Sequence, residues 1–392
     1  MSRFLFVVPP LVGHINPVVG VAARLAERGH TVAWVCPDAE LVARLAGADP
    51  LVHPCAGPAH GGDAARRPPD LRGPEALRFL WEWYLLPLAE AMAPGVRAAV
   101  ERFRPDVVVA DQQAFAGALV AERLGVPWAT SATTTAELTD PLAGLPKVRE
   151  WVEGRLAGLR HTVGDPSGTA DPRFSPHLVL AFSTPELAGP ATGRAVRWVG
   201  PSIDARPVTS GFPWEWLDPG RATVLVTLGT ANADAGGRFL DVCRGVLRER
   251  ADRVQGVIVD PGGAPAAGPD GKDVLVVGSV PQLALLERGV GAVVCHAGHN
   301  TVCEALWHRA PLVVAPIRDD QPVVAGQVVD AGAGVRVRFG RVGAPKLGAA
   351  LDAVLHEPGY RAAAERIGTA FRAAGGAPAA ASHLELLAEE SA

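Results

Sequence analysis

Residues 4–35, FLFVVPPLVGHINPVVGVAARLAERGHTVAWV, contain the pattern that decides the fold. Phe4–Val8 is a short run of apolar residues, typical of a strand that is buried on both faces. A helix is predicted to begin at about Pro17, which suits a first turn, and to end at Gly29. The next strand is predicted over Thr31–Val35. This order of strand, helix and strand is typical of a parallel sheet covered by helices.

The same alternation continues along most of the chain and predicts an α/β fold of two domains. Further strands are predicted at Asp106–Ala110, Val126–Thr130, Leu178–Phe182, Thr223–Thr227, Val254–Val259, Val274–Val277, Gly291–Val294 and Leu312–Ala315. Prolines recur over residues 201–219, and because proline lacks a backbone N–H this segment is predicted to be a linker. We therefore expect two Rossmann-like, doubly wound domains, at 1–200 and 220–375, and a helical tail at 376–392.

Composition excludes several classes of protein. The 392 residues are 48% hydrophobic and 20% charged, enough for packed cores and inconsistent with disorder. The net charge of −4 argues against nucleic-acid binding and against a polybasic membrane surface. No apolar run approaches the roughly 18 to 20 residues that span a bilayer. The five cysteines are scattered and odd in number, which predicts reduced thiols. We expect a cytoplasmic protein without an integral membrane segment.

The segment Cys295–Glu304, CHAGHNTVCE, is the most informative for function. It follows a predicted strand and leads into a predicted helix. Its two histidines and two cysteines suggest zinc, but their spacing is unusual for a metal site and no second ligand pair lies nearby in the sequence. We therefore predict no metal site here.

An anion site fits this segment better. Gly298 would let the backbone approach a ligand, and Asn300 and Thr301 would cap the helix. The N–H groups and the dipole at a helix N-terminus attract phosphate. His296 would add a hydrogen-bond donor, and the Glu304 carboxylate could accept from ribose hydroxyls. A capped helix without a ligand is the alternative interpretation.

Residues 296–304, followed by Pro316–Gln321 (PIRDDQ), resemble the donor-binding signature of the family 1 glycosyltransferases. Three further segments match motifs of this family in the expected order: Gly13-His14-x2-Pro17, Thr227–Thr230 and Val280–Gln282. The resemblance covers most of the chain. It implies the GT-B fold, in which two Rossmann-like domains face each other across a cleft.

The resemblance also implies which residues bind the donor. The diphosphate would be bound by Gly229, Thr230, His296, Gly298, Asn300 and Thr301. The nucleoside would be bound by Ser279, Val280, Gln282 and Glu304, and the donor sugar by Asp320 and Gln321. Family members often carry an aromatic residue at the position of Ser279, where it stacks on the base. The identity of the base, uracil or thymine, therefore stays open.

His14 is the predicted general base. It follows the first strand, in a segment expected to be a loop at the cleft. A neutral imidazole suits the removal of a proton from a hydroxyl nucleophile. Asp111, which follows the strand Asp106–Ala110, would hold the tautomer of His14 and matches the aspartate of the family's dyad. A structural histidine is the alternative interpretation.

The acceptor site is harder to predict. Phe79, Trp81, Trp83 and Tyr84 lie within six positions, and in this family such segments line the acceptor pocket. The alternative is ordinary core, because Phe79 and Trp83 would share one face of a helix. Thr133 is a further candidate for acceptor binding.

These observations predict a metal-independent, inverting glycosyltransferase that uses a nucleotide sugar and no other cofactor. It would move a hexose or deoxyhexose from a UDP or dTDP donor to a small hydrophobic acceptor in bacterial secondary metabolism, such as antibiotic biosynthesis. A nucleotide-sugar epimerase and a non-catalytic glycosyltransferase-like helper are the alternatives. Acceptor identity, the atom that is glycosylated and homodimer formation stay open.

Overall fold

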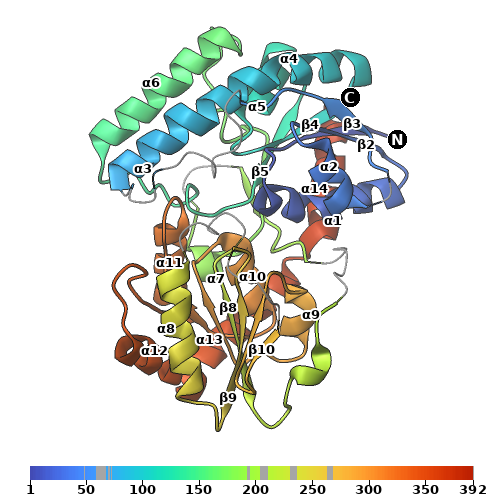
Figure 1. Cartoon of the computed structure of the whole chain (residues 1–392). Helices are drawn as coiled ribbons and strands as arrows, with labels where there is room; N and C mark the ends of the chain where they lie inside the picture. The colour runs from blue at the N-terminus through green and yellow to red at the C-terminus, as the bar shows by residue number, and fades with distance from the viewer. Residues whose placement is uncertain are drawn as a thin grey trace. The chain divides into compact units, whose positions relative to one another are not determined.

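A computed structural model describes residues 1–47, 49–58, 68, 71, 73–191, 195–203, 211–229, 236–262 and 268–391 (Figure 1). In chain order the elements of its first half are β1 (Arg3–Val7), α1 (Val12–Glu27), β2 (Thr31–Cys36), α2 (Ala39–Ala46), β3 (Val52–Pro54), α3 (Gly73–Phe79), the π-helix η2 (Leu80–Leu85), α4 (Leu86–Phe103), β4 (Val107–Asp111), α5 (Phe115–Arg123), β5 (Trp128–Ala132), α6 (Pro146–Thr162), β6 (Leu178–Ala181), α7 (Pro185–Ala188) and β7 (Val196–Trp198). The second half contains the 3-10 helix η3 (Trp214–Trp216), β8 (Ala222–Thr227), α8 (Gly237–Arg248), β9 (Val254–Val259), β10 (Gly268–Asp270), β11 (Val274–Val277), α9 (Gln282–Glu287), β12 (Ala292–Cys295), α10 (His299–Trp307), β13 (Leu312–Val314), α11 (Gln321–Asp330), β14 (Gly334–Arg336), α12 (Ala344–His356), α13 (Pro358–Ala373) and α14 (Gly376–Glu390).

The chain divides into two compact units. One consists of Met1–Arg67, Leu71–Pro207 and Ala373–Ala392, and the other of Pro68–Asp70 and Val208–Arg372. The segment expected to be a C-terminal tail thus forms α14 and belongs to the first unit. Part of the segment expected to be a linker, residues 204–210, lies outside the described residues.

Each unit is built around one sheet of the doubly wound type. The first sheet has the order β3-β2-β1-β4-β5-β6-β7, and its strand pairs are parallel. The second has the order β10-β11-β9-β8-β12-β13-β14, in which only the edge pair β10 and β11 is antiparallel within the described residues. This confirms the α/β prediction of two Rossmann-like sheets.

The strand order reverses at one place in each sheet. In the first sheet β1 pairs with β2 on one side and with β4 on the other. In the second sheet β8 pairs with β9 on one side and with β12 on the other. Connections leave such a reversal toward opposite faces, which opens a crevice at the carboxyl ends of the two central strands. The fold therefore predicts one ligand-binding position after β1 and β4 and another after β8 and β12.

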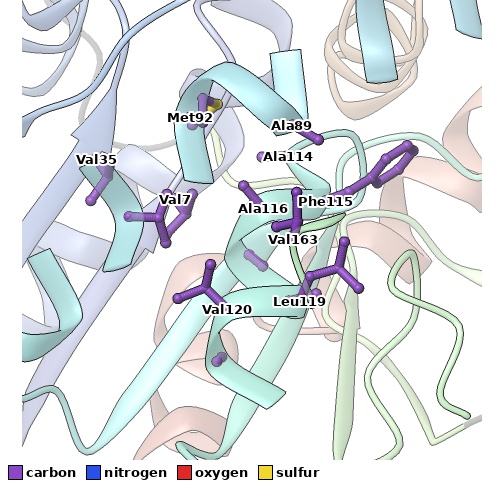
Figure 2. Close-up of a cluster of buried hydrophobic side chains, with 14 of the residues drawn as sticks. Val7, Val35, Ala89, Met92, Ala114, Phe115, Ala116, Leu119, Val120 and Val163 are labelled. Atoms are coloured by element: carbon purple, nitrogen blue, oxygen red, sulfur yellow. The ribbon is translucent and has the colours of Figure 1, made fainter. Parts of the chain in front are cut away.

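Burial on both faces explains why the first strand reads as a continuous apolar run. Phe4 and Phe6 pack into a cluster with residues of α1 and α14. Leu5 and Val7 pack into a second cluster with residues of α4 and α5. Figure 2 shows part of this second cluster, in which Val7 lies with Met92 of α4 and Phe115 of α5. Full burial of one such side chain contributes about 1.5 to 3 kcal/mol to folding.

The structure corrects one prediction that matters for the site. The helix expected from about Pro17 begins five residues earlier, at Val12, and Pro17 lies inside it. Two backbone bonds close the first turn, since the amides of His14 and Ile15 both donate to Leu11 O. His14 is therefore a residue of the first turn of α1 rather than of a loop.

Candidate active site

His14 and Asp111 meet at the position where the order of the first sheet reverses. His14 lies just after β1, and Asp111 is the last residue of β4, the neighbouring strand. His14 Nδ1 lies 2.9 Å from Asp111 Oδ1 and 3.1 Å from Oδ2. The His14 side chain is 15% exposed and that of Asp111 is fully buried. The His14 side chain is therefore accessible to a ligand, while the buried Asp111 carboxylate fixes its orientation through Nδ1.

The Asp111 carboxylate receives donors from three different segments. Gln113 N donates to Oδ1 over 2.8 Å, and the Thr133 hydroxyl donates to Oδ2 over 3.1 Å. His14 is the third partner. A buried carboxylate with several hydrogen-bond donors is compensated for the loss of water. These contacts fix the orientation of the group that faces His14.

Thr133 has a position that sequence reasoning missed. It was expected to bind the acceptor, but its Oγ1 lies 2.9 Å from His14 Nδ1 in addition to its bond to Asp111. Thr133 follows β5, which pairs with β4 so that Asp111 is opposite Ser131. Thr133 lies two residues beyond Ser131, so its contact with Asp111 can be inferred only when the pairing of β4 with β5 is known.

The predicted acceptor residues divide into two pairs. Trp81 and Tyr84 are each 2% exposed and belong to the core that contains α4 and α5. Trp83 is 59% exposed, and its ring stacks with that of Phe79 at a centroid distance of 6.0 Å. The π-helical turn η2 carries Trp81, Trp83 and Tyr84. π-Helical turns are rare in proteins, and those that occur are often found at functional sites.

A small cavity in the first unit has Trp81 in its wall. Its volume is about 100 Å³. Its other lining residues are Leu77, Glu137, Asp140, Pro141, Leu142, Arg149, Val152, Glu153, Arg173 and Phe174. The cavity combines an apolar wall with ion pairs, such as Arg149 with Asp140 over 2.8 Å. Sequence reasoning missed it because its residues come from four segments that share no motif.

The turn after β12 forms the centre of the predicted diphosphate site. Ala297 has a left-handed backbone with φ 68°, and Gly298 is the N-cap of α10. The N-cap position is thus taken by a residue without a side chain, and not by Asn300 or Thr301 as expected. Both lie within the first turn of α10, where backbone amides have no partner inside the helix. Backbone amides at a helix N-terminus are the groups that bind anions in many proteins, so diphosphate binding here stays a prediction.

His296 packs closely between two glycines that follow the two central strands of the second sheet, Gly229 after β8 and Gly298 after β12. A Cβ at Gly229, which has φ 70°, would lie 2.7 Å from His296 Cε1, and a Cβ at Gly298 would overlap the same ring. The structure therefore brings together three of the residues expected to bind the diphosphate. Thr230, the neighbour of Gly229 and also expected there, lies outside the described residues.

Burial makes His296 a neutral hydrogen-bonding group. Loss of solvation lowers the pKa of its imidazole to about 4, opposed by a hydrogen bond with the backbone of Thr227 and aided by the nearby charge of Arg318. Arg318 thus lies near the predicted phosphate site, although sequence reasoning gave it no role. An arginine within the Pro316–Gln321 motif was the available signal.

The histidines and cysteines of this segment do not converge on one point. His299 Nε2 lies 3.4 Å from Cys303 Sγ on the next turn of α10. Cys295 is at the end of β12, where burial raises the pKa of its thiol to about 12. Within the part of the chain that the structure describes, no group of three or more His, Cys, Asp and Glu side chains could hold a metal ion.

Two residues expected to bind the nucleoside contact each other across 22 positions. Gln282 is the first residue of α9, and its Nε2 donates to Glu304 Oε2 over 2.6 Å. This bond orients the Glu304 carboxylate. Val280 is half-buried, and Ser279 is exposed.

The turn after β13 contains the residues expected to bind the donor sugar. Gln321 is 6% exposed, and its Oε1 accepts from Ile317 N over 2.9 Å and from Arg318 N over 3.0 Å. Asp319 has a left-handed backbone with φ 56°, and Asp320 is the N-cap of α11. Gln321 thus holds the turn together through its amide oxygen.

Comparisons with known proteins agree with this geometry. The family described as "UDP-glucoronosyl and UDP-glucosyl transferase" matches residues 266–373. The 4'-demethylrebeccamycin synthase of Lentzea aerocolonigenes is 31% identical over 417 residues, which cover 93% of this chain and 94% of that protein. The demethyllactenocin mycarosyltransferase of Streptomyces fradiae is 28% identical, over 98% of this chain and 86% of that protein.

Solved structures show the same fold. The crystal structure of the glycotransferase of kitacinnamycin has a TM-score of 0.80 and 25% identity, and covers 98% of both chains. The calicheamicin glycosyltransferase CalG4 has a TM-score of 0.78 at 22% identity and supports the fold alone, over 99% of this chain and 98% of that chain.

The chain is a glycosyltransferase with the GT-B fold, and it belongs to the UDP-glucoronosyl and UDP-glucosyl transferase family. In the described residues, no helix is both long and apolar enough to cross a membrane.

Proposed function

We propose that the protein transfers a hexose or deoxyhexose from a UDP- or dTDP-linked donor to a hydroxyl group of a small hydrophobic acceptor, with inversion at the anomeric carbon. His14 acts as the general base, and no metal ion takes part. The observation that carries this proposal is the contact between His14 Nδ1 and Asp111 at the end of β1 and β4.

The chemistry of His14 follows from this contact. A proton on Nδ1 is donated to the Asp111 carboxylate, which leaves the Nε2 lone pair to accept a proton from the acceptor hydroxyl. The acceptor oxygen bonds to the anomeric carbon while the bond from that carbon to the diphosphate oxygen breaks. The proton ends on Nε2, and Asp111 stabilises the imidazolium that forms. Attack opposite the leaving group inverts the configuration.

The leaving diphosphate is stabilised by the turn between β12 and α10. Backbone amides at the start of α10 offer hydrogen bonds and a partial positive charge to the charge that develops. Arg318 supplies a full positive charge nearby. Neutral His296, whose one N–H is hydrogen-bonded to the backbone of Thr227, packs against Gly229 and Gly298 and shapes the turn. These groups do in this proposal what Mg²⁺ does in other sugar transferases.

The rest of the donor is assigned to residues of α9, α10 and α11. Glu304, oriented by Gln282, accepts hydrogen bonds from ribose. Gln321 uses its oxygen for the turn, so its amide nitrogen donates to a sugar hydroxyl, and Asp320 accepts from another. The acceptor class rests on two relatives, whose names refer to rebeccamycin and to demethyllactenocin. Both names favour an acceptor from bacterial secondary metabolism.

The test is the variant His14→Ala, assayed with UDP-glucose and with dTDP-linked deoxyhexoses on a panel of aromatic and macrolide alcohols. We expect kcat to fall by a factor of about 10² to 10⁴, the usual contribution of a general base. Affinity for the nucleotide should stay within about two-fold, because the donor residues lie in the second unit. Product formation is followed by mass spectrometry, and NMR of the product checks the inverted anomeric configuration.

The matched control is His161→Ala, which removes an exposed histidine of α6 whose Nδ1 hydrogen-bonds to Ala157 O of its own helix. It should leave kcat unchanged. Wild-type turnover by His14→Ala would contradict the general-base role. Conversion of the donor sugar without an acceptor would favour the epimerase alternative, and donor binding without any turnover would favour the helper alternative.

A further inference from the structure

We propose that Thr133 is a positioning residue, whose hydroxyl group holds His14 and Asp111 in the arrangement that proton transfer requires. This inference rests on the proposed function of His14 as general base. Thr133 contacts the base and its carboxylate partner and acts on the reaction through them.

The three side chains form a closed set of contacts. His14 Nδ1 lies 2.9 Å from Asp111 Oδ1 and 2.9 Å from Thr133 Oγ1. Thr133 Oγ1 in turn lies 3.1 Å from Asp111 Oδ2. Thr133 is 3% exposed and Asp111 is 1% exposed, so these contacts do not compete with bulk water. Hydrogen bonds in such surroundings are costly to leave unmade.

Counting protons gives one arrangement that satisfies all three of these contacts. A threonine hydroxyl has one proton to donate and two lone pairs that accept. When Thr133 donates to Asp111 Oδ2, one of its lone pairs accepts from Nδ1–H of His14. The Nδ1 proton is then shared between the carboxylate and the hydroxyl, and both acceptors favour the same tautomer.

The opposite tautomer leaves this set of contacts unsatisfied. With its proton on Nε2, His14 would turn the Nδ1 lone pair toward the Asp111 carboxylate. The single Thr133 proton could serve the imidazole or the carboxylate, but not both. Thr133 therefore raises the preference for the tautomer in which Nε2 carries the lone pair, and it restricts rotation of the imidazole ring.

The decisive variant is Thr133→Val, which keeps the shape of the side chain and removes the hydroxyl. We expect kcat to fall 10- to 100-fold with the KM for donor and acceptor unchanged. Thr133→Ser, which restores the hydroxyl, should recover kcat to within about three-fold. If Thr133→Val fails to fold, Thr133→Ala tests the same loss of the hydroxyl.

The matched control is Thr130→Val on β5. Thr130 is also buried, and its hydroxyl accepts a hydrogen bond from Ser175 N over 2.7 Å, away from His14. This variant should lower thermal stability and leave kcat per folded molecule unchanged. A fall in kcat equal to that of Thr133→Val would mean that loss of any buried hydroxyl on this segment slows the enzyme, and would overturn the proposal.

A double-mutant cycle with Asp111→Asn separates positioning from substrate binding. If Thr133 acts through Asp111 and His14, the Thr133→Val change should cost less than three-fold in the Asp111→Asn background. If Thr133 instead binds the acceptor or the sugar, the KM should rise and the two effects should multiply. The second result would overturn the inference.

Parallel assays of His14→Ala distinguish failure of the proposed function from failure of the role of Thr133. Wild-type turnover by His14→Ala refutes the proposed function, and the role of Thr133 falls with it. Loss of turnover by His14→Ala together with wild-type turnover by Thr133→Val refutes the role of Thr133 alone.

Discussion

At the scale of the residue, the surroundings of His296 decide how it can act on a phosphate. Its ring is enclosed by Gly229 and Gly298, and neither position has space for a Cβ. Burial lowers the pKa of the imidazole to about 4, so at neutral pH the ring carries no charge, and its one N–H is hydrogen-bonded to the backbone of Thr227. The positive charge near this site comes from Arg318 and from the start of α10.

The lowered pKa of His296 predicts a dependence of stability on pH. In the unfolded chain the imidazole of His296 has a pKa near 6.5, whereas in the folded state it is protonated only near pH 4 and below. This contribution is therefore complete above pH 6.5 and is lost as the pH falls toward 4. Relative to His296→Gln, the wild type should lose about 2 kcal/mol of unfolding free energy between pH 7.5 and pH 5.

Urea unfolding at several pH values measures this difference, and histidines common to both proteins cancel in the comparison. Parallel pH profiles for wild type and His296→Gln would contradict the account of this site.

The sequence predicted which residues belong to the site better than it predicted which of them contact each other. His14 and Asp111 were expected to pair because each follows a recognisable apolar strand. The contacts of Thr133 depend on the pairing of β4 with β5, which no local pattern reports. The same holds for Gln282 and Glu304, which lie on different helices and meet only in the folded unit.

At the scale of the element, α14 shows how distant parts of the chain complete one core. Gly376 N donates to Val199 O at the bend before the helix. Glu385 then receives two partners from the turn after α1, Arg28 Nη1 over 2.7 Å and His30 Nε2 over 2.9 Å. The apolar face of α14, which includes Leu384, is buried with residues of α1.

Leu384→Ala should therefore destabilise the first unit although the residue lies near the C-terminus. Leu384 is fully buried, and truncation of such a leucine costs about 2 to 5 kcal/mol. The matched control is Leu386→Ala on the same helix, where the side chain is 52% exposed and the expected change is within about 0.5 kcal/mol. Thermal and urea unfolding compare the two. Equal stabilities would show that α14 contributes little to this core.

Elements could be predicted wherever they were long enough to show a pattern. The longer strands and the final helix were expected from runs of apolar residues. Of the three-residue strands, β13 was expected within Leu312–Ala315, while β3, β7, β10 and β14 were missed, because three residues are too few to display an alternation. The start of α1 was misplaced because Pro17 was taken to mark a first turn, while the backbone begins to coil at Val12.

At the scale of the whole molecule, both units place their candidate residues at the same position of a doubly wound sheet. Each unit has a sheet whose order reverses at its centre, and the candidate residues lie after the two central strands. In the first unit these residues are His14 and Asp111, and in the second they are Gly229 and His296. The sequence predicted both sheets because parallel strands buried on both faces are continuously apolar.

The acceptor site was the least predictable feature at this scale. Four aromatic residues within six positions suggested a pocket, but Tyr84 belongs to the core and Trp83 is exposed. Aromatic side chains serve cores and binding sites alike, so their clustering alone does not separate the two. The charged residues that line the cavity beside Trp81 come from segments without a motif.

The claim on which the rest depends is that the second unit binds a pyrimidine nucleoside diphosphate and that the protein uses the corresponding nucleoside diphosphate sugar as its glycosyl donor. Isothermal titration with UDP, dTDP, GDP and NAD, without added metal, tests it most directly. We predict that UDP or dTDP binds with micromolar or tighter affinity, while GDP and NAD do not bind. Binding of NAD, or of no diphosphate at all, would contradict the assignment of residues 296–304 and the proposed function with it.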